Sequence, residues 1–310
     1  MIRRAVGIAI AALALMGTPL AAQDESAETD AIVVSAQRSG APMWIVDGPR
    51  GTLVLVGEIT AIPKSTPWYP DRLEEATREA ERVILGTRSR VSPGDVLRLI
   101  FGGSRITRLP DRTVAADYLD AGQMARLTAL EQLYDEDYSR RSLLMTSFDL
   151  FTRRLRFNRD TGPDASDVVR RAASRARVPA EPVGTVRGED VLDNLAEADP
   201  RSHIPCLEAA MTAAEAGRDI VEQRADAWRA FDVPAVMANP LELALGKCWP
   251  WADSDLGGEL RGQWTEALAS ASEAEGVTLA VVPLRVLAEE DGVLDQLQSR
   301  GLDISGPDWR

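Results

Sequence analysis

The sequence predicts an α+β protein, in which a central mixed β-sheet is covered by helices. Two observations lead to this fold class. Short β-rich runs, bounded by turn residues, alternate with amphipathic helical patterns near both ends of the domain. The long middle of the chain has almost entirely helical apolar spacing. A strand-helix-strand unit at each end can contribute to one sheet, and the helical middle can then cover it.

The first 22 residues have the order of a secretory signal peptide. Arg3 and Arg4 precede an apolar stretch over residues 5–16, and small residues follow up to Ala22. The apolar stretch is shorter than the about 20 residues that a membrane span needs. An uncleaved anchor is the alternative. We expect cleavage near Ala22, a periplasmic or secreted mature protein, and no membrane span after cleavage.

The remaining chain divides into a short leader and one domain. Residues 23–41 are acidic and then small and polar, with too little apolar surface to pack alone, so we expect a flexible leader. The remaining length suits one large domain or two closely packed ones, and we expect residues 42–310 to form a single domain.

The charge of the chain narrows the classes of partner. The formal net charge is −13. Binding to nucleic acid phosphates takes clustered Lys and Arg without surplus carboxylates. We therefore expect no nucleic-acid partner, and we interpret the negative charge mainly as a means of keeping the protein soluble.

The first ordered element is expected to be a β-hairpin. Residues 43–46 and 52–56 are β-rich runs on either side of a turn at 47–49. An amphipathic helix is expected after Pro70, and the apolar run 83–85 is the strand that closes the first strand-helix-strand unit.

Helical patterns dominate the middle of the chain. They cover residues 93–101, 113–118, 121–133, 139–157, 165–176, 204–231 and 256–274. The end repeats the opening plan with a strand over 277–282, a helix over 291–300 and a strand over 302–304. Gly301 is a typical stop between that last helix and strand.

Cys206 and Cys248 are the two cysteines of the chain. In an oxidising compartment an even number of cysteines is typical of disulfide bonding. Two thiolates so far apart, without a Cys-x-x-Cys pair, would make a poor metal site. We expect one disulfide that closes a loop of about 40 residues.

The run Leu53-Val54-Leu55-Val56-Gly57-Glu58-Ile59-Thr60, with the strand 83–85 that follows, resembles the first signature of the TraB/GumN family, which includes relatives of the Tiki proteases. That signature is a strand ending in Gly-x-x-His, then a helix and a second strand closing on Glu. Here Gly57 is kept, Thr60 stands in the histidine position and Gly86 in the glutamate position.

Later segments carry the same resemblance. Val183-Gly184-Thr185 is similar to a Leu-Glu-Thr run of the family, with Gly184 in place of the acid. Residues 281–287 are similar to its apolar strand and Gly-x-Gly-His-Leu, with Val286 in the histidine position. An Arg-Asn pair of the preceding helix is kept only in part, as Arg261-Gly262.

The resemblance implies a helix-covered mixed sheet in two related halves, with a metal-dependent hydrolase site in some members. A transition-metal site needs imidazole, carboxylate or thiolate ligands. Thr60, Gly86, Gly184 and Val286 replace none of them. The single histidine, His203, cannot restore two histidine ligands. We therefore expect no metal and no other cofactor.

The candidate site residues surround the position that the resemblance assigns to the site. The candidates for binding are Glu58, Thr60, Arg261, Trp264 and Arg285. Glu58 follows the strand directly and could be a carboxylate base or a binding acceptor, with a solvated loop acid as the alternative. Arg261 is the second candidate for a catalytic role.

Two further features have a functional and a structural interpretation. Trp249-Pro250-Trp251 could stack on a sugar or peptide beside Asp253 and Asp255, and packing against the disulfide is the alternative. His203 could be a lone base, but we interpret it as a surface residue at a helix start.

Three functions are compatible with these features. The favoured one is an exported, non-catalytic member of a metal-hydrolase family that binds an envelope polysaccharide, a peptide or an envelope protein. The alternative is a peptidase-like hydrolase with a rearranged acidic site, built on Glu58, Arg261 and acids such as Asp253 or Asp255. The third is a structural envelope protein.

Overall fold

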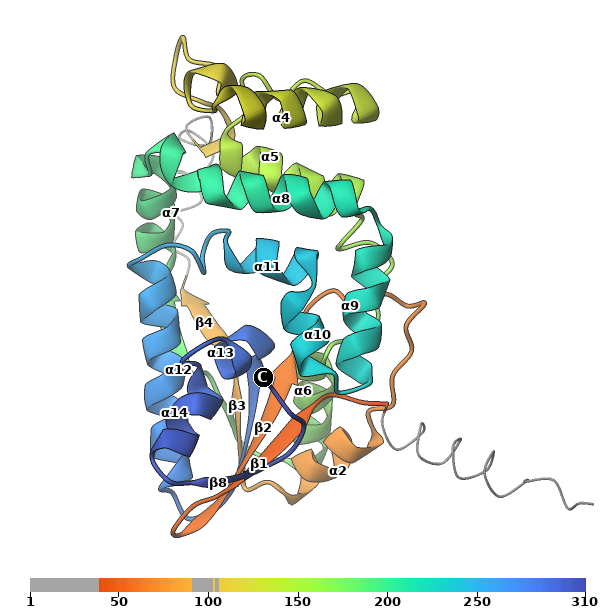
Figure 1. Cartoon of the computed structure of the whole chain (residues 1–310). Coiled ribbons are helices and arrows are strands. Elements are labelled where there is room, and N and C mark those ends of the chain that lie inside the picture. Colours follow the sequence, from red (N-terminus) through yellow and green to blue (C-terminus); the bar gives the residue numbers. More distant parts are fainter. Residues whose placement is uncertain (1–38, 91–102, 104–105) are drawn as a thin grey trace, which may run out of the picture. The chain divides into compact units, whose positions relative to one another are not determined.

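The computed structural model describes residues 39–90, 103 and 106–310 (Figure 1). The expected signal peptide, most of the expected leader and the helix predicted over 93–101 lie outside the described residues. Gly40 and Ala41 are described and buried, and the amide of Gly40 donates to the carbonyl of Arg229. The packed domain therefore includes these two residues.

A mixed sheet of six strands is the centre of the described structure (Figure 1). Its spatial order is β5-β3-β7-β2-β1-β8. The strands are β1 (Met43–Asp47), β2 (Gly51–Glu58), β3 (Arg82–Leu85), β5 (Ala180–Glu181), β7 (Gly276–Pro283) and β8 (Asp303–Ser305). Strands β2, β7, β3 and β5 run parallel, whereas β1 is antiparallel to β2 and β8. The predicted fold class and the predicted hairpin are confirmed.

The two faces of this sheet are covered by different helices. Helices α2 (Asp71–Glu79) and α6 (Ala165–Ala176) contact one face, and α12 (Leu256–Ser272) and α13 (Leu284–Ala288) contact the other. Helix α14 (Val293–Ser299) packs on α13.

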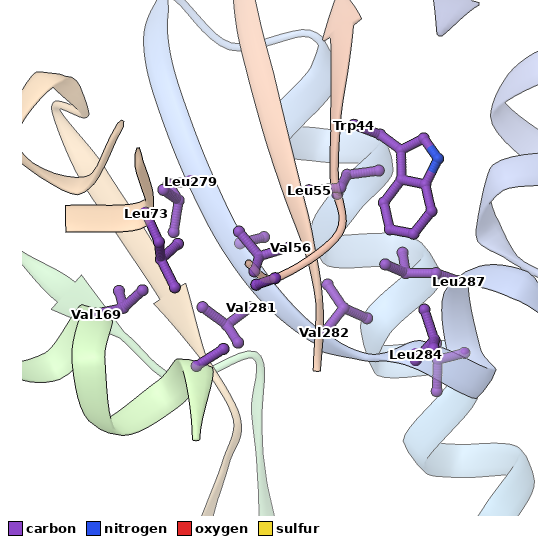
Figure 2. Close-up of a cluster of buried hydrophobic side chains, with 14 of the residues drawn as sticks. Trp44, Leu55, Val56, Leu73, Val169, Leu279, Val281, Val282, Leu284 and Leu287 are labelled. Carbon is purple, nitrogen blue, oxygen red and sulfur yellow. The ribbon is translucent and has the colours of Figure 1, made fainter. Parts of the chain in front are cut away.

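Alternate residues of the central strands supply these two faces. Val56 and Val281 are register partners and lie toward Leu73 and Val169, whereas Leu55 lies on the side of Trp44 (Figure 2). All six side chains are at most 2% exposed. Burying each of them contributes roughly 1.5–3 kcal/mol.

A second core lies among the helices of the middle of the chain. These helices are α4 (Ala121–Tyr134), α5 (Leu143–Asp149), α7 (Gly188–Glu197), α8 (Ile204–Ala216), α9 (Asp219–Arg229) and α11 (Pro240–Gly246). Helix α10 (Val233–Ala238) lies between them in sequence, and its buried valines belong to the core at the sheet. Helix α8 contacts α4, α5, α9 and α11 and is central to this group. Two further strands, β4 (Thr87–Arg90) and β6 (Gly184–Arg187), pair in parallel and form a separate small sheet. In the sequence, β4 follows β3 and β6 follows β5.

Several predicted helices are correct and two are wrong in extent. Helices α4, α6 and α12 match their predicted ranges closely. The long helix predicted over 139–157 begins only at Leu143, because Ser142 caps it, and it continues as a π-helical turn over Leu150–Arg154. The helix predicted over 113–118 is a single 3-10 turn, Ala115–Asp117.

The helical pattern over 204–231 is divided into two helices. Gly217 has a φ of 90°, which a residue with a side chain rarely adopts, so α8 ends there and α9 begins at Asp219. Helices α10, α11 and α13 were not predicted. No described helix is long and apolar enough to cross a membrane.

A disulfide joins the second core to the segment after α11. The sulfur atoms of Cys206 and Cys248 are 2.00 Å apart, and both residues are 1% exposed. The predicted pairing is present in the structure. It closes a loop with a sequence separation of 42 residues.

Replacing both Cys206 and Cys248 by alanine is expected to destabilise the protein. A loop of this length restricts the unfolded chain enough to change the free energy of unfolding by roughly 2–4 kcal/mol. Urea denaturation of the oxidised wild-type protein and the double variant measures the difference. Two reactive thiols per chain in the protein from an oxidising compartment would contradict the pairing.

Candidate functional site

The four positions that resemble the family's motif gather at one edge of the sheet. Strands β2, β3 and β7 are parallel, so Thr60, Gly86 and Val286 all follow carboxyl ends that lie at the same edge. Gly184 is the register partner of Thr87, which directly follows Gly86. The carboxyl edge of a parallel sheet is where ligands of such folds usually bind, so this edge is the first place to look for a site.

A buried cluster of three charged side chains lies at this edge. Arg224 of α9 donates from Nε to Glu242 Oε2 of α11 over 2.6 Å. Arg285 of α13 donates to the other oxygen, Oε1, and also to the carbonyl of Glu242 over 3.0 Å. The exposed fractions are 4% for Arg224, 4% for Glu242 and 7% for Arg285. One carboxylate is thus shared by two guanidinium groups.

The cluster reaches directly to the candidate position Thr60. Nη1 of Arg224 donates to the carbonyl oxygen of Thr60 over 3.0 Å, while the Thr60 side chain is exposed. Arg285 occupies the space beside Gly246 into which a side chain at that position would extend. The structure therefore brings together Thr60 and Arg285, two of the predicted binding residues, through Arg224 and Glu242.

The electrostatics of the cluster favour the charged form of its acid. Burial by itself raises the pKa of Glu242, but the guanidinium groups of Arg224 and Arg285 outweigh it and hold that pKa below its usual value. The pKa of Arg285 is lowered by burial, then by Arg224, against the opposing effect of Glu242 and Glu289. Glu242 is a carboxylate at neutral pH and carries a full negative charge between the two cations.

Glu58 lies at the same edge but turns toward α6. Its Oε1 accepts from the backbone amide of Ser166 over 2.7 Å, and its Oε2 accepts from Ser166 Oγ over 2.9 Å. Burial, and then the nearby Asp164, raise the pKa of Glu58 from 4.5 to about 7, although both hydrogen bonds from Ser166 and the charge of Arg170 act in the opposite direction. Glu58 therefore changes charge near neutral pH.

Arg261 is engaged on the other side of the sheet. Its Nε and Nη2 donate to the two oxygens of Glu289, over 2.6 and 3.1 Å, and its Nη1 donates to the carbonyl of Trp251 over 2.9 Å. The guanidinium carbon lies 5.6 Å from the centre of the Trp251 ring. Arg261 lies on α12, which covers the sheet face opposite to α6, the partner of Glu58. The structure therefore does not bring Glu58 and Arg261 together.

Trp264 belongs to the core beneath the sheet. It is 2% exposed and packs within the same cluster as the strand residues. It anchors α12 to the sheet and does not present its ring to a ligand.

The Trp249-Pro250-Trp251 segment and its acids are tied to the structure. Trp249 packs on the second core and donates through Nε1 to Asn194 Oδ1, over 3.1 Å. Asn194 in turn donates to Asp253 over 3.0 Å. Asp253 also accepts from the amides at the start of α12, at Asp255 and Leu256. This arrangement matches the packing interpretation of the segment.

The described residues at this edge do not fit a transition-metal centre. They contain no group of three histidine, cysteine, aspartate or glutamate side chains that could hold an ion. Gln263 fills the space beside Gly184 toward which a glutamate there would extend. The carboxylate of Glu242, the buried acid at this edge, already accepts hydrogen bonds from the cationic side chains of Arg224 and Arg285. The donor set is therefore unsuited to a cation.

Arg224 and Glu242, the two residues on which this edge depends, are not among the residues predicted from the sequence. Arg224 lies within an amphipathic helical pattern and Glu242 within a short helix that was not predicted. The signal that was present is the start of α11 at Asn239-Pro240, where the side chain of Asn239 caps the helix and accepts from Leu241. This start signal indicates a helix, but it does not indicate which residues pair with Glu242.

The fold and this edge define the class of the protein, a helix-covered mixed α/β domain whose parallel strands present one carboxyl edge. Comparison with known proteins gives the particular family: the model of the TraB/PrgY/gumN family matches residues 42–305, and the chain belongs to this family. The resemblance seen in the sequence is confirmed. Searches of curated proteins and of solved structures gave no match.

Changing Glu58 to glutamine is expected to flatten the pH dependence of stability. The pKa is higher in the folded protein, about 7, than the ordinary 4.5, so the folded state binds the proton more tightly. The contribution of Glu58 is complete below about pH 4.5 and is lost as the pH rises toward 7. The loss is at most about 3 kcal/mol, because each pKa unit corresponds to about 1.4 kcal/mol.

Urea denaturation at pH 5 and pH 8 measures this loss for the wild-type protein and for Glu58→Gln. Glu79→Gln, an exposed change on α2, is the control, and its free energy of unfolding is expected to change between the two pH values as in the wild-type protein. If the free energy of unfolding of Glu58→Gln changed between pH 5 and pH 8 as much as that of the wild-type protein, the Glu58 carboxyl would not titrate in this range.

Changing Glu242 to glutamine is expected to be among the most destabilising single changes at this edge. It leaves the buried Arg224 and Arg285 without a counter-charge, which costs about 3–5 kcal/mol. The triple change Arg224→Met, Glu242→Leu and Arg285→Met is expected to cost less, since no unpaired charge remains.

The comparison uses the free energy of unfolding in urea. The surface pair Arg126–Glu215, whose side chains are 37% and 42% exposed, gives a control: Glu215→Gln is expected to change stability by less than about 1 kcal/mol. Equal effects of Glu242→Gln and Glu215→Gln would contradict the role given to the buried cluster.

Proposed function

We propose that this protein is an exported member of the TraB/PrgY/gumN family that has lost metal-dependent hydrolysis and acts by binding. Its ligand belongs to the envelope: a polysaccharide or other polymer, a peptide, or a partner protein. The observation that carries the proposal is the pair of guanidinium groups at the carboxyl edge of the sheet, where the family resemblance expects a metal centre.

The positions of the two arginines support the loss of a metal. Arg224 hydrogen-bonds the backbone of Thr60, and Arg285 directly precedes Val286, so a buried cation is associated with both positions that correspond to histidines. The cluster has two positive charges and one negative charge. A divalent ion near it meets net repulsion, and this is strongest where water is excluded.

Export is supported by the sequence and by the disulfide. The order of charged, apolar and small residues over 1–22 is typical of a signal peptide. The Cys206–Cys248 bond is of the kind that persists in oxidising compartments and is rare in the cytosol.

The alternative of an acidic hydrolase receives no comparable support. Two catalytic carboxyl groups must flank one cleft at a defined separation. Glu58 is held by Ser166 of α6, Asp253 by Asn194 and the start of α12, and Arg261 by Glu289. These interactions direct the side chains to different parts of the fold.

Metal analysis of the purified mature protein tests the proposal. We expect zinc, manganese and cobalt far below one ion per chain, even after incubation with each metal, because the donor set does not fit. Glu58→Ala is expected to leave this result unchanged, as is Glu79→Ala, the surface control. Stoichiometric metal that is lost in Glu58→Ala but kept in Glu79→Ala would overturn the proposal.

A further inference from the structure

A pocket of about 580 Å³ lies in the helical region, away from the sheet edge. It is formed by residues 106–111, by the start of α5 and by the segment from the end of α7 to the 3-10 turn Pro200–His203. Its volume is within the range of about 300–1,000 Å³ that is usual for small-molecule sites. Neither Glu58 nor the buried arginine cluster lines it.

The floor of the pocket is apolar. Leu109, Leu143 and Leu144 are 4%, 0% and 2% exposed, and the partly buried Leu195 adds a fourth leucine. These side chains are anchored in or against the second core and close the bottom of the pocket. Accessible apolar surface of the lining comes from residues that are not fully buried, such as Ile106, Leu195 and Ala196. Such a floor favours the apolar body of a ligand.

The charged groups of the pocket are mostly cationic. Arg108 and Arg140 line it and are exposed, and Asp111 is the acid of the lining. The amide of Leu109 donates to the carbonyl of Arg140 over 3.1 Å, and Arg108 forms an antiparallel bridge with Arg141, so the backbones of the two arginine-bearing segments lie side by side. Within the described part of the chain, neither guanidinium group has a hydrogen-bond or ion-pair partner.

His203 completes the polar side of the pocket. Burial lowers its pKa, and the more distant charge of Asp253 opposes the shift. The imidazole is therefore neutral at neutral pH and can donate or accept one hydrogen bond.

Arginines are frequent in the segment that supplies Arg140 and the leucines of α5. Residues 138–159 contain six arginines and one aspartate, whereas the whole chain has a formal charge of −13. This segment includes Arg140 and the helix that supplies Leu143 and Leu144. Arg141, Arg153 and Arg154 of this segment are ion-paired with Glu136 and Asp149, whereas Arg140 has no ion pair with a described residue, so the charge of Arg140 is available to an anionic ligand.

We propose that this pocket binds a small organic acid, with its carboxylate on the guanidinium groups of Arg108 and Arg140 and its apolar body on the leucine floor. The inference rests on the proposed binding function and names the chemical class of a ligand. A carboxylate matches the planar fork of arginine and can be held in two parallel hydrogen bonds. The apolar floor distinguishes such an acid from inorganic phosphate, which has no apolar part.

Titration of the full-length, methyl-labelled protein with matched acids and amides tests this inference. The probes are N-acetyl-leucine and octanoate, each compared with its neutral amide, and inorganic phosphate. We expect both acids to shift the methyl signals of the floor leucines and to bind about tenfold or more tightly than their amides, because the charge-assisted bonds are lost. Binding of one acid alone would identify the kind of apolar body that the pocket accepts.

Substitutions separate the pocket from general charge attraction. Arg108→Ala and Arg140→Ala are each expected to weaken binding of the acid about tenfold. Arg159→Ala, an exposed change in the same basic segment that does not line the pocket, is expected to have little effect. Because Arg108 and Arg140 are exposed, these variants are expected to fold, and circular dichroism checks this.

Three results would overturn the inference: equal binding of acid and amide, phosphate binding as tight as that of the acids, or no binding up to the solubility limit of the probes. Equal weakening by Arg159→Ala would show attraction to the segment as a whole and would also overturn it. The metal analysis is independent. A metal-free protein that binds no acid contradicts only this inference, and a metal-loaded protein that binds acids contradicts only the proposed loss of the metal centre.

Discussion

The buried carboxylate of Glu242 is the interaction on which the arrangement of this domain depends. It lies on α11, and it accepts hydrogen bonds from Arg224 of α9 and Arg285 of α13. Arg224 also donates a hydrogen bond to the carbonyl of Thr60, which follows β2. Arg285 lies at the start of α13, which follows β7. One acid therefore ties two helices of the helical region to the ends of the two central strands. Because all three side chains are nearly inaccessible to water, loss of Glu242 would leave two buried cations without a counter-charge, whereas loss of one arginine would leave the carboxylate with its other partner.

Such a cluster fixes geometry more than it adds stability. Removing three charges from water costs several kcal/mol per ion, and the mutual attraction in the interior repays this only when hydrogen bonding is nearly complete. Hydrogen bonding in this cluster is nearly complete, because Arg285 also donates to the backbone of Glu242 and Arg224 donates to the backbone of Thr60. The bonds have directions, so they specify how α9, α11 and α13 approach the strand ends. Apolar contacts alone, such as those of the sheet core, would allow more than one approach.

The sequence allowed the sheet to be predicted but not the cluster. The hairpin, β3, β7 and helices α4, α6 and α12 follow from local periodicity, and the family frame follows from Gly57 and the runs around it. Glu242 is 18 residues from Arg224 and 43 from Arg285, so no local pattern joins them. Arg285 was a candidate because it lies beside Val286 in the run that resembles the family's last motif, but this position does not reveal that it is buried against Glu242. Trp264 was a candidate because of its place in a motif, but its apolar helical spacing also matches the core position that it occupies.

The state of its arginines distinguishes the sheet edge from the pocket. At the edge, the guanidinium groups of Arg224 and Arg285 are buried and share one carboxylate, so they have no free fork for a ligand. A cation near this edge would still meet these two fixed positive charges and would have to compete with both of them for Glu242. In the pocket, Arg108 and Arg140 are exposed beside an apolar floor and are not engaged by described residues. Arginines whose guanidinium groups are already paired with a carboxylate cannot bind a second anion, whereas unpaired arginines can. Ligand recognition in this fold is therefore expected where the arginines are still free to form ion pairs.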